Sequence, residues 1–347
     1  IRRQRQMCIR DSFYISRGLH NKPLAAFFAV SIIIALGFIG NMVQANSIAD
    51  GFHKAFEIPQ WATGIFVFAI AGFIFIGGVR RIASFAEKMV PLMAVVYILG
   101  SLTIIFSNYD MILPAFKEII VGAFDPSAAT GGIIGASLKE AIRYGVARGL
   151  FSNEAGMGSA AITAAAATTD DPVRQGYINM TGTFWDTIVV CSITGITIAA
   201  SGVLGMTGAD GKPLKGVELT MAAFSTNIGE IGALIVAIGI ILFAFSTILG
   251  WEYHGEKAWE YLFGTHKYNM IYRIVFSLVV YVGATQTLDL VWNLSDIANA
   301  LMAIPNLISL LILSPVIKEE VERFQIVLEK EKAEKKAGVT AGEHAKI

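Results

Sequence analysis

The apolar positions of this chain form long runs that are separated by short polar stretches. A helix needs about 20 consecutive apolar residues to cross a bilayer, and eight runs approach or exceed that length. They cover residues 24–48, 61–79, 89–107, 131–169, 176–201, 231–251, 271–287 and 294–317. The pattern predicts an all-α, polytopic membrane protein whose transmembrane domain occupies residues 13–317.

The segments outside these runs have a different character. Residues 1–12 are basic and lack apolar periodicity, and we interpret them as foreign or disordered sequence. Residues 318–347 are rich in charge and predict a tail that is helical at first and then disordered. Residues 108–130 contain two prolines and predict a wet or surface-lying segment, whereas residues 202–216 predict a turn.

The fourth run is interrupted in its middle, near residues 149–158. There Ser152, Asn153 and Glu154 break the apolar pattern, and Gly156 and Gly158 follow them. An unpaired backbone group is costly in lipid, so a spanning helix breaks only where the freed groups line a cavity or coordinate something. The simpler alternative is a re-entrant loop, or two short helices that pack together without a binding role.

Composition limits the possible function classes. The chain of 347 residues is 54% hydrophobic and only 16% charged, whereas soluble domains are about 25% charged. The net charge of zero excludes nucleic-acid binding as a main function, which would need a basic surface. The two cysteines lie far apart, and no phosphate-binding loop, nucleophile elbow or metal-ligand pattern occurs, so we expect neither an enzyme nor a cofactor.

The charges of the loops test the number of spans. Lysine and arginine collect on the cytoplasmic side of membrane proteins. In an eight-span arrangement, the loops near residues 17–22, 80–88, 174 and 257–273 and the lysine-rich tail all fall on one side. We therefore expect both ends of the chain to be cytoplasmic.

Polar side chains inside the predicted spans are candidate ligands. Asn41 and Gln44 stand three residues apart and share one face of the first span. Their amides can bind an amine or a carboxylate without adding charge, although hydrogen bonding between helices is an equal alternative. Ser246 and Thr247 in the sixth span offer hydroxyl oxygens that suit a hard cation such as sodium, but both could instead donate back to their own helix.

Two further residues have more than one interpretation. Asp186 is a lone carboxylate in the fifth span and must face protein or water. We favour a structural pairing with Arg143 or Arg148 over a role in ion coupling. Trp292, at the start of the eighth span, could be an interfacial aromatic residue or the lid of a pocket.

Together these segments resemble the sodium:alanine symporters, also known as the alanine or glycine:cation symporter family. The resemblance extends from Phe13 to Ile317. The matching segments are GNMVQANSIAD (40–50), RYGVARGLFSNEAGMGSA (143–160), DPVRQG (171–176), FAFSTILGW (243–251), YHGEK (253–257), LDLVWNLSD (288–296) and LMAIPNLI (301–308).

The resemblance implies a leucine-transporter-like fold of two inverted five-helix repeats, with the broken helix of residues 131–169 as the first helix of the second repeat. It also implies the residues of two sites. The amino-acid pocket would be bordered by Asn41, Gln44, Phe151, Ser152, Gly156, Met157 and Trp292. Ser246 and Thr247 would form the hydroxyl half of a sodium site.

The chain departs from the family pattern in two places. The first two core helices of the family have no counterpart before Phe13, so we expect an N-terminally truncated carrier. Residues 159–163 replace a segment in which the family usually carries a proline and then a histidine, and this difference bears on substrate preference.

The sequence therefore predicts sodium-coupled symport of a small neutral amino acid, alanine or glycine, across the cell membrane. Alternatives within transport are another neutral amino acid, such as glutamine or D-alanine, and proton coupling. Two hypotheses in which the protein does not transport also stay open: a membrane scaffold or receptor, and a transport-inactive fragment of a carrier. The expected partners are the amino acid, the sodium ion and the lipid bilayer, and nucleic acid is not expected.

Overall fold

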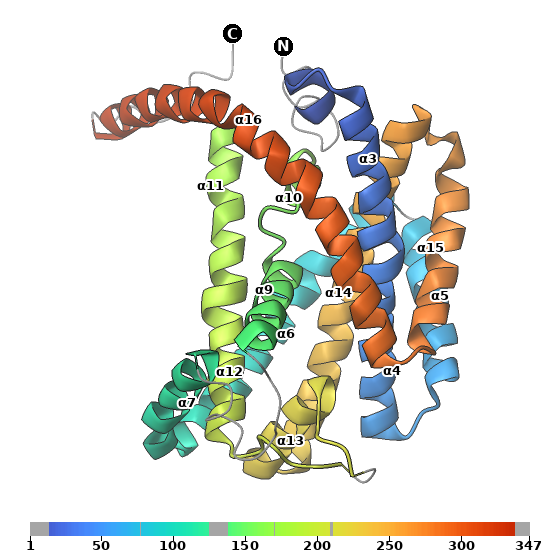
Figure 1. Cartoon of the computed structure of the whole chain (residues 1–347), viewed down its shortest axis with the longest axis vertical. Coiled ribbons are helices and arrows are strands. Elements are labelled where there is room, and N and C mark those ends of the chain that lie inside the picture. Colours follow the sequence, from blue (N-terminus) through green and yellow to red (C-terminus); the bar gives the residue numbers. More distant parts are fainter. Residues whose placement is uncertain (1–13, 77, 125–137, 170, 209–210, 337–347) are drawn as a thin grey trace.

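A computed structural model of the chain describes residues 14–76, 78–124, 138–169, 171–208 and 211–336, and these residues form helices and loops with a single isolated β-bridge (Figure 1). The helices are η1 (Tyr14–Gly18), α3 (Lys22–Ile32), η2 (Ile33–Gly40), α4 (Asn41–Phe56), α5 (Gln60–Ile76), α6 (Gly78–Ser107), η3 (Tyr109–Met111), α7 (Ile112–Phe124), α9 (Leu138–Asn153), α10 (Ala160–Ala164), α11 (Pro172–Thr183), η4 (Phe184–Cys191), α12 (Ser192–Ala200), α13 (Gly216–Ile228), α14 (Glu230–Phe263), η5 (His266–Tyr268), α15 (Asn269–Ala284) and α16 (Leu288–Lys336).

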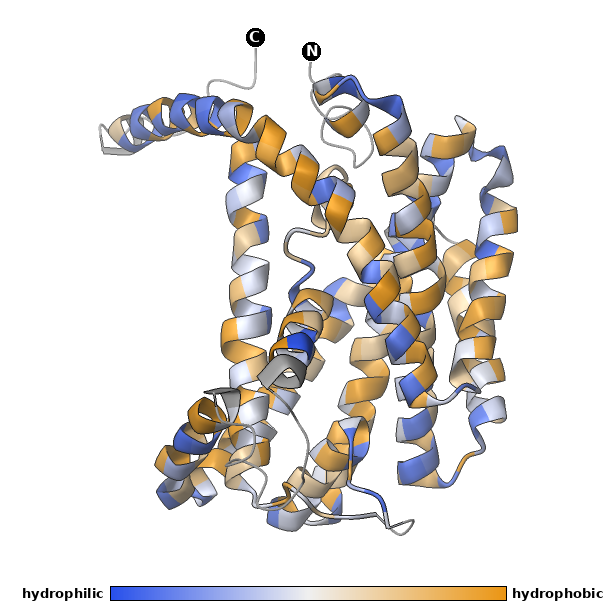
Figure 2. Ribbon diagram, viewed as in Figure 1, coloured by the Kyte–Doolittle hydropathy of each residue, from blue (hydrophilic) through white to orange (hydrophobic). Residues whose placement is uncertain are grey.

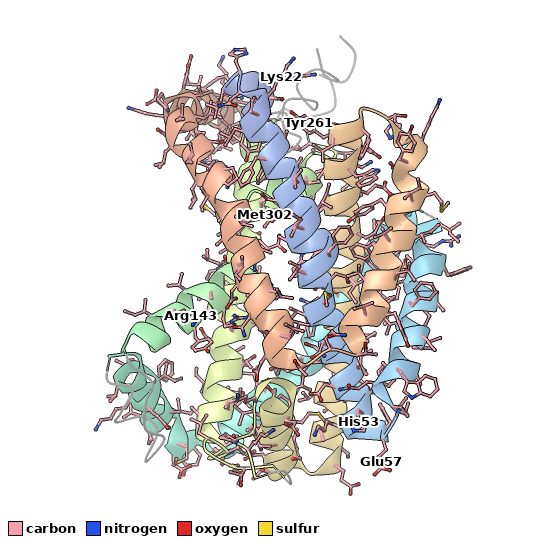
Figure 3. The ribbon with its side chains drawn as sticks, turned by 45° about the vertical axis from the view of Figure 1, so that its right-hand side comes forward. Lys22, His53, Glu57, Arg143, Tyr261 and Met302 are labelled. Atoms are coloured by element: carbon pink, nitrogen blue, oxygen red, sulfur yellow. The ribbon has the colours of Figure 1, made fainter. Side chains whose placement is uncertain are left out.

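The first long element is a continuous rod in which α3, η2 and α4 follow one another. It begins where Asn21 caps the first turn by accepting a hydrogen bond from the backbone N–H of Leu24 at 3.0 Å. It ends at Glu57, whose left-handed conformation, φ 57°, turns the chain out of the helix. Figure 3 shows Lys22 at one end of this rod and His53 and Glu57 at the other.

Helix α14 is the central element of the bundle. It packs against the rod of α3, η2 and α4 and against α6, α13 and α15. The largest core cluster joins α14 to the N-terminal rod and to α15 through buried side chains such as Phe28 of α3, Ile248 of α14 and Phe276 of α15, each of which is fully buried. Because α14 touches so many partners, its position fixes where the side chains of its middle turns point.

Among the described residues, five helices are long and apolar enough to cross a membrane: Lys22–Phe56, Arg81–Ser107, Pro172–Ala200, Glu230–Phe263 and Leu288–Ala333. Figure 2 shows hydrophobic colour along these rods and polar colour at the far end of α16. Helix α5 is apolar but shorter, with 17 residues, and α9 and α15 have 16 residues each. A polytopic, all-helical membrane protein is thereby confirmed, whereas the number of eight spans stays a prediction.

The structure adds detail to two segments outside the predicted spans. Residues 112–124 form the helix α7 inside the segment that we predicted to be wet or surface-lying. The predicted helical start of the charged tail is present, because α16 continues without a break from the last span to Lys336. The segment of residues 1–12, the start of the broken run at 131–137 and the last residues, 337–347, lie outside the described residues.

An ion pair ties α11 to the extended α16. Asp171 caps α11 through the backbone N–H of Val173, and its other oxygen lies 2.6 Å from Arg323 of α16. Burial alone would raise the pKa of Asp171, but the hydrogen bond and charge of Arg323 outweigh it and hold this pKa below its usual value.

The pKa of Asp171 predicts how stability depends on pH. A carboxyl whose pKa is lower in the folded state stabilises that state above its unfolded pKa, and this stabilisation is lost as pH falls through the folded pKa. We expect the thermal denaturation midpoint of the detergent-solubilised protein to fall in acid, and Asp171→Asn to remove part of that fall. The exposed Asp110→Asn is the matched control, and an equal effect of both substitutions would contradict the assignment.

Candidate functional site

The interruption predicted in the fourth apolar run is present in the structure. Helix α9 ends at Asn153 and α10 begins at Ala160. Between them Glu154, Gly156 and Gly158 have positive φ angles of 53°, 79° and 91°. Such angles favour glycine, because a Cβ atom clashes with the backbone there, and the two glycines therefore allow the chain to leave the helical path.

Side chains satisfy several backbone groups that the break sets free. The Asn153 side chain accepts a hydrogen bond from the N–H of Ala155 at 2.9 Å. Asn306, in the middle of α16, donates to the carbonyl of Gly156 at 2.7 Å. The break is thus supported from its own sequence and from a helix 150 residues further along the chain.

Glu154 connects the break to the central helix. One of its carboxylate oxygens accepts a hydrogen bond from the indole Nε1 of Trp251 in α14 at 2.6 Å, and the other accepts one from the hydroxyl of Ser159. Trp251 is 4% exposed. A buried indole N–H needs an acceptor, so this carboxylate holds α14 and the two halves of the break in register.

A cavity of about 480 Å³ opens where the break faces α14. This volume lies within the range of ordinary small-molecule sites, about 300–1,000 Å³. Several helices and the break contribute its lining: Gln44, Tyr97, Phe151, Ser152, Glu154, Asp186, Val190, Cys191, Thr194, Thr220, Val236, Ile240, Phe243, Thr247 and Trp251. The wall is mostly apolar, and several of the lining helices each add a hydroxyl, amide or carboxyl group.

Asp186 supplies the second carboxylate of this cavity. The hydroxyl of Ser152 lies 2.9 Å from both of its oxygens, and the side chains of Asn153 and Thr187 are 3.1 Å apart beside it. Asp186 and Glu154 therefore both border the cavity near Ser152. Two carboxylates in an apolar surrounding favour a positively charged group between them.

The predicted structural pairing of Asp186 with an arginine is not observed for Arg148. The guanidinium of Arg148 instead lies 2.5 Å from Asp296 of α16 and 3.7 Å above the ring of Trp292. Arg143 stands earlier in α9, near the ring of Tyr144. The prediction failed because Asp296, far away in the sequence, lies beside α9 in the folded chain.

The residues predicted to border the amino-acid pocket fall into two groups. Gln44, Phe151 and Ser152 line the cavity. Asn41, Gly156, Met157 and Trp292 do not belong to its lining. Asn41 is fully buried and donates to the carbonyl of Phe276 at 3.4 Å.

Two of the residues outside the lining pack behind it. Met157 is 1% exposed and belongs to the core, because the turn at the break directs it away from the cavity. Trp292 makes an edge-to-face contact with Phe151, with ring centroids 4.7 Å apart. Trp251 makes the same kind of contact with Phe151 at 5.4 Å. Trp292 thus supports a wall of the cavity from behind.

The two predicted sodium ligands differ in their surroundings. Ser246 and Thr247 both donate to the carbonyl of Phe243, at 2.8 and 3.0 Å. This is the back-bonding to their own helix that their sequence context also allowed. Thr247 also lines the cavity whereas Ser246 does not. A hydroxyl that donates to a carbonyl keeps its lone pairs, so Thr247 can still offer an oxygen to a cation.

Sequence reasoning did not select Glu154, Trp251 or Tyr97 as site residues. Glu154 carried a signal, because it is the charged member of the polar triplet in the break. Tyr97 of α6 carried none, and only the fold shows its hydroxyl 2.8 Å from that of Thr194, which also lines the cavity. Within the described part of the chain, no three His, Cys, Asp or Glu side chains form a metal-ligand group.

A broken helix beside a largely apolar cavity, in an all-helical protein with several membrane-spanning rods, defines a multi-pass transport protein of the cell membrane. The chain belongs to the sodium:alanine symporter family, whose family model matches residues 10–338. This membership makes it a symporter and not an enzyme. The match begins inside the segment that we interpreted as foreign, and it gives no support to the prediction of a truncated N-terminus.

Several curated relatives are similar over most of the chain. An uncharacterized transporter of Haemophilus influenzae is 47% identical over 315 residues, which are 90% of this chain and 68% of the relative. The sodium/alanine symporter AgcS of Methanococcus maripaludis is 45% identical over 323 residues, 92% of this chain and 70% of the relative. A probable sodium/glutamine symporter of Bacillus subtilis is 38% identical over 306 residues, 88% of this chain and 62% of the relative.

Proposed function

We propose that this protein carries a small neutral amino acid, alanine or glycine, into the cell together with sodium, and that the cavity at the break is the amino-acid site. The observation that carries the proposal is the chemistry of the cavity wall. Asp186 and Glu154 suit the ammonium group of an amino acid, and the amide of Gln44 suits its carboxylate. The remaining wall is apolar and suits a short aliphatic side chain.

Similarity to relatives supports the same substrate class. A relative that is 45% identical is named as a sodium/alanine symporter, and one that is 38% identical is named as a probable sodium/glutamine symporter. Alanine is favoured over glutamine because the relative named as a sodium/alanine symporter is the more similar of the two.

We also propose the fold and orientation that the family resemblance implies. In this arrangement α9 and α10 form the first, broken helix of the second of two inverted repeats, and both ends of the chain face the cytoplasm. One sodium ion that enters down a potential of 100 mV gains about 2.3 kcal/mol, enough to accumulate the amino acid about fifty-fold.

Equilibrium binding tests the proposal directly. We expect labelled alanine to bind the purified protein more tightly in sodium than in an equal concentration of potassium, and unlabelled glycine to displace it better than glutamine. Uptake into liposomes with an inward sodium gradient then tests transport. Alanine binding that is the same in both salts, or displacement by glutamine alone, would reject the proposed substrate and coupling ion.

Thr247 gives a sharper prediction about sodium. Thr247→Ala removes a cavity-facing oxygen, and the loss of one ion contact of about 1.5 kcal/mol should weaken the sodium enhancement of alanine binding about tenfold. Ser246→Ala is the matched control, because Ser246 makes the same backbone hydrogen bond without lining the cavity. The assignment fails if both substitutions leave the sodium dependence unchanged.

A further inference from the structure

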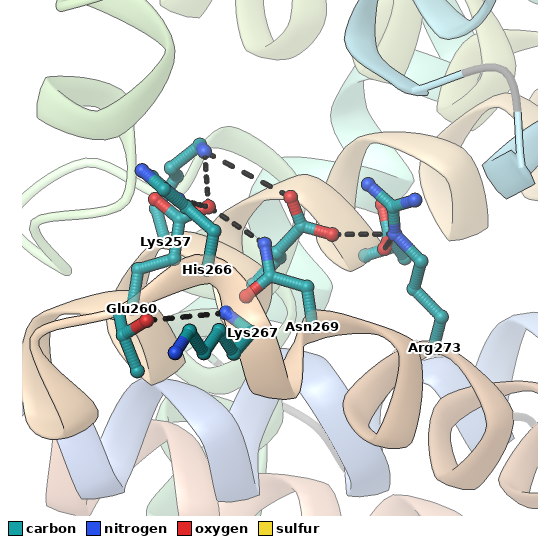
Figure 4. Close-up of polar contacts among 9 residues, drawn as sticks. Lys257, Glu260, His266, Lys267, Asn269 and Arg273 are labelled. Atoms are coloured by element: carbon teal, nitrogen blue, oxygen red, sulfur yellow. Dashed lines mark hydrogen bonds and ion pairs between the residues drawn. The ribbon is translucent and has the colours of Figure 1, made fainter.

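A second group of buried charges lies outside the cavity, where the last turns of α14 meet the first turns of α15 (Figure 4). Glu252, Glu256 and Glu260 follow one another at four-residue spacing on α14, so their carboxyl groups lie along one face of the helix. Glu252 is 2% exposed and Glu256 is 5% exposed. Buried carboxylates are costly unless each is paired, so their partners decide the charge state of the group.

The outer member of the group is fully paired. Glu260 lies 2.7 Å from the ammonium of Lys257, 2.7 Å from the amide nitrogen of Asn269 and 2.9 Å from Nδ1 of His266. Its negative charge is therefore balanced by Lys257. His266 is 80% exposed, and its ring contacts Glu260, the outer carboxylate.

The two inner carboxylates share one cation. Nε of Arg273 lies 2.6 Å from Glu256 and 3.5 Å from Glu252. Lys257 is 3.8 Å from Glu256, but it already balances Glu260. One oxygen of Glu252 is buried without a hydrogen-bond partner, as is the hydroxyl of Tyr272. With both inner glutamates ionised, one negative charge would stand uncompensated in the interior.

The neighbours of Glu252 limit what can neutralise this charge. The groups that interact with it electrostatically are Glu256 and Lys257 of its own helix and Arg273 and Tyr272 of α15. In the described part of the chain, the other helices packed against α14 bring no titratable group to it. A metal cation would need several oxygens and would meet the guanidinium at the same carboxylates, whereas a proton needs only one donor and one acceptor.

We propose that Glu252 and Glu256 form a proton-binding site in which one proton is shared between the two carboxyl groups, with Arg273 balancing the remaining charge. The two side chains stand one helical turn apart, and both contact the same guanidinium nitrogen, Nε of Arg273. A carboxyl pair that holds one proton titrates as a unit. This site is separate from the amino-acid cavity and does not depend on the identity of the cargo.

The site begins one residue after the cavity lining along α14. Glu252 follows Trp251, whose indole donates to Glu154 in the break, so the proton and the amino acid would act on different faces of the same turn of α14. Loss of the proton would place an unbalanced charge between α14 and α15 and loosen their contact. The protein would thereby sense pH through the helix that also forms the cavity wall.

Infrared spectroscopy of the purified protein during a pH titration tests the site without any transport. We expect the carbonyl-stretch band of a buried carboxylic acid near neutral pH and its loss at alkaline pH. Glu252→Gln and Glu256→Gln should each abolish the band, because the remaining carboxylate is then balanced by Arg273. The exposed Glu319→Gln is the control and should leave it unchanged.

A second measurement keeps the test decisive. The thermal denaturation midpoint of the unsubstituted protein should fall as pH rises through the loss of the band, because the folded state then gives up its extra proton. Glu252→Gln and Glu256→Gln should each remove this fall. At alkaline pH, the denaturation midpoint of each variant should be higher than that of the unsubstituted protein. Absence of the band at every pH, or a band that persists in both variants, overturns the proposal. Sodium-dependent stabilisation in place of the band would identify a metal-cation site instead and overturn it equally.

Discussion

Replacement of Gly158 by alanine is expected to destabilise the protein by about 2–5 kcal/mol, the sum of an unfavourable backbone conformation and overpacking. Gly158 has a φ angle of 91°, and a Cβ atom there would lie 2.4 Å from Cζ of Phe28 and 3.0 Å from Oδ1 of Asn306. The ring of Phe28 is fully buried in the core and has no room to retreat. The measurement is the thermal denaturation midpoint in detergent, together with the yield of monodisperse protein.

Gly145 provides the matched control for this substitution. It lies in α9 with nothing within 4 Å of the place that a Cβ atom would take, and alanine in an exposed helical site usually stabilises by about 0.5–1 kcal/mol. We therefore expect Gly145→Ala to be neutral or slightly stabilising. Equal losses in the two variants would show that α9 tolerates no change at all and would remove the special role of the tight approach at Gly158.

Replacement of Glu154 by alanine is expected to weaken alanine binding about tenfold or more. The substitution leaves the buried indole N–H of Trp251 without its acceptor, and such an unsatisfied group costs about 1–3 kcal/mol. It also removes one of the two carboxylates of the cavity. The first loss changes the position of the break relative to α14, and the second removes a charge from the cavity. The affinity for alanine should therefore fall more than the overall stability.

Glu154→Gln separates the two contributions of this side chain. Glutamine keeps an oxygen for the Trp251 indole and can exchange a hydrogen bond with Ser159, but it has no charge. Retained structure with weakened alanine binding would assign the effect to the carboxylate charge. Binding that survives in both variants would contradict a role for Glu154 in the site, and calorimetric titration with alanine gives the measurement.

The break itself was predictable from the sequence, because polar residues and glycines inside an apolar run disfavour a continuous helix in a membrane. The side chains that hydrogen-bond to the break could not be predicted in the same way. Asn306 stabilises the Gly156 carbonyl from a helix 150 residues away in the sequence, and no local pattern indicates that the two lie together in space. The same limit explains why Asp296 and not Asp186 pairs with Arg148.

The candidate site shows a similar division. Helical spacing placed Asn41 and Gln44 on one face, but it could not tell which of them reaches the cavity. In the structure Gln44 lines the cavity, whereas Asn41 donates to the backbone of α15. One face of the helix thus borders both the cavity and a neighbouring helix. For Ser246 and Thr247, adjacent positions differ by about 100° around the helix, and only the position of α14 in the bundle decides which one faces inward.

The rod from Pro172 to Ala200 is the least enclosed of the long apolar helices in the described residues: 17% of its apolar stretch is buried, against 56% for the N-terminal rod. It carries Cys191, a free thiol that is exposed and lines the cavity. The sequence contains one other cysteine, Cys8. Exchanging Cys8 for serine would therefore leave a single native attachment point, at which a fluorophore or spin label reports on cargo arrival with no engineered residue in the transmembrane domain.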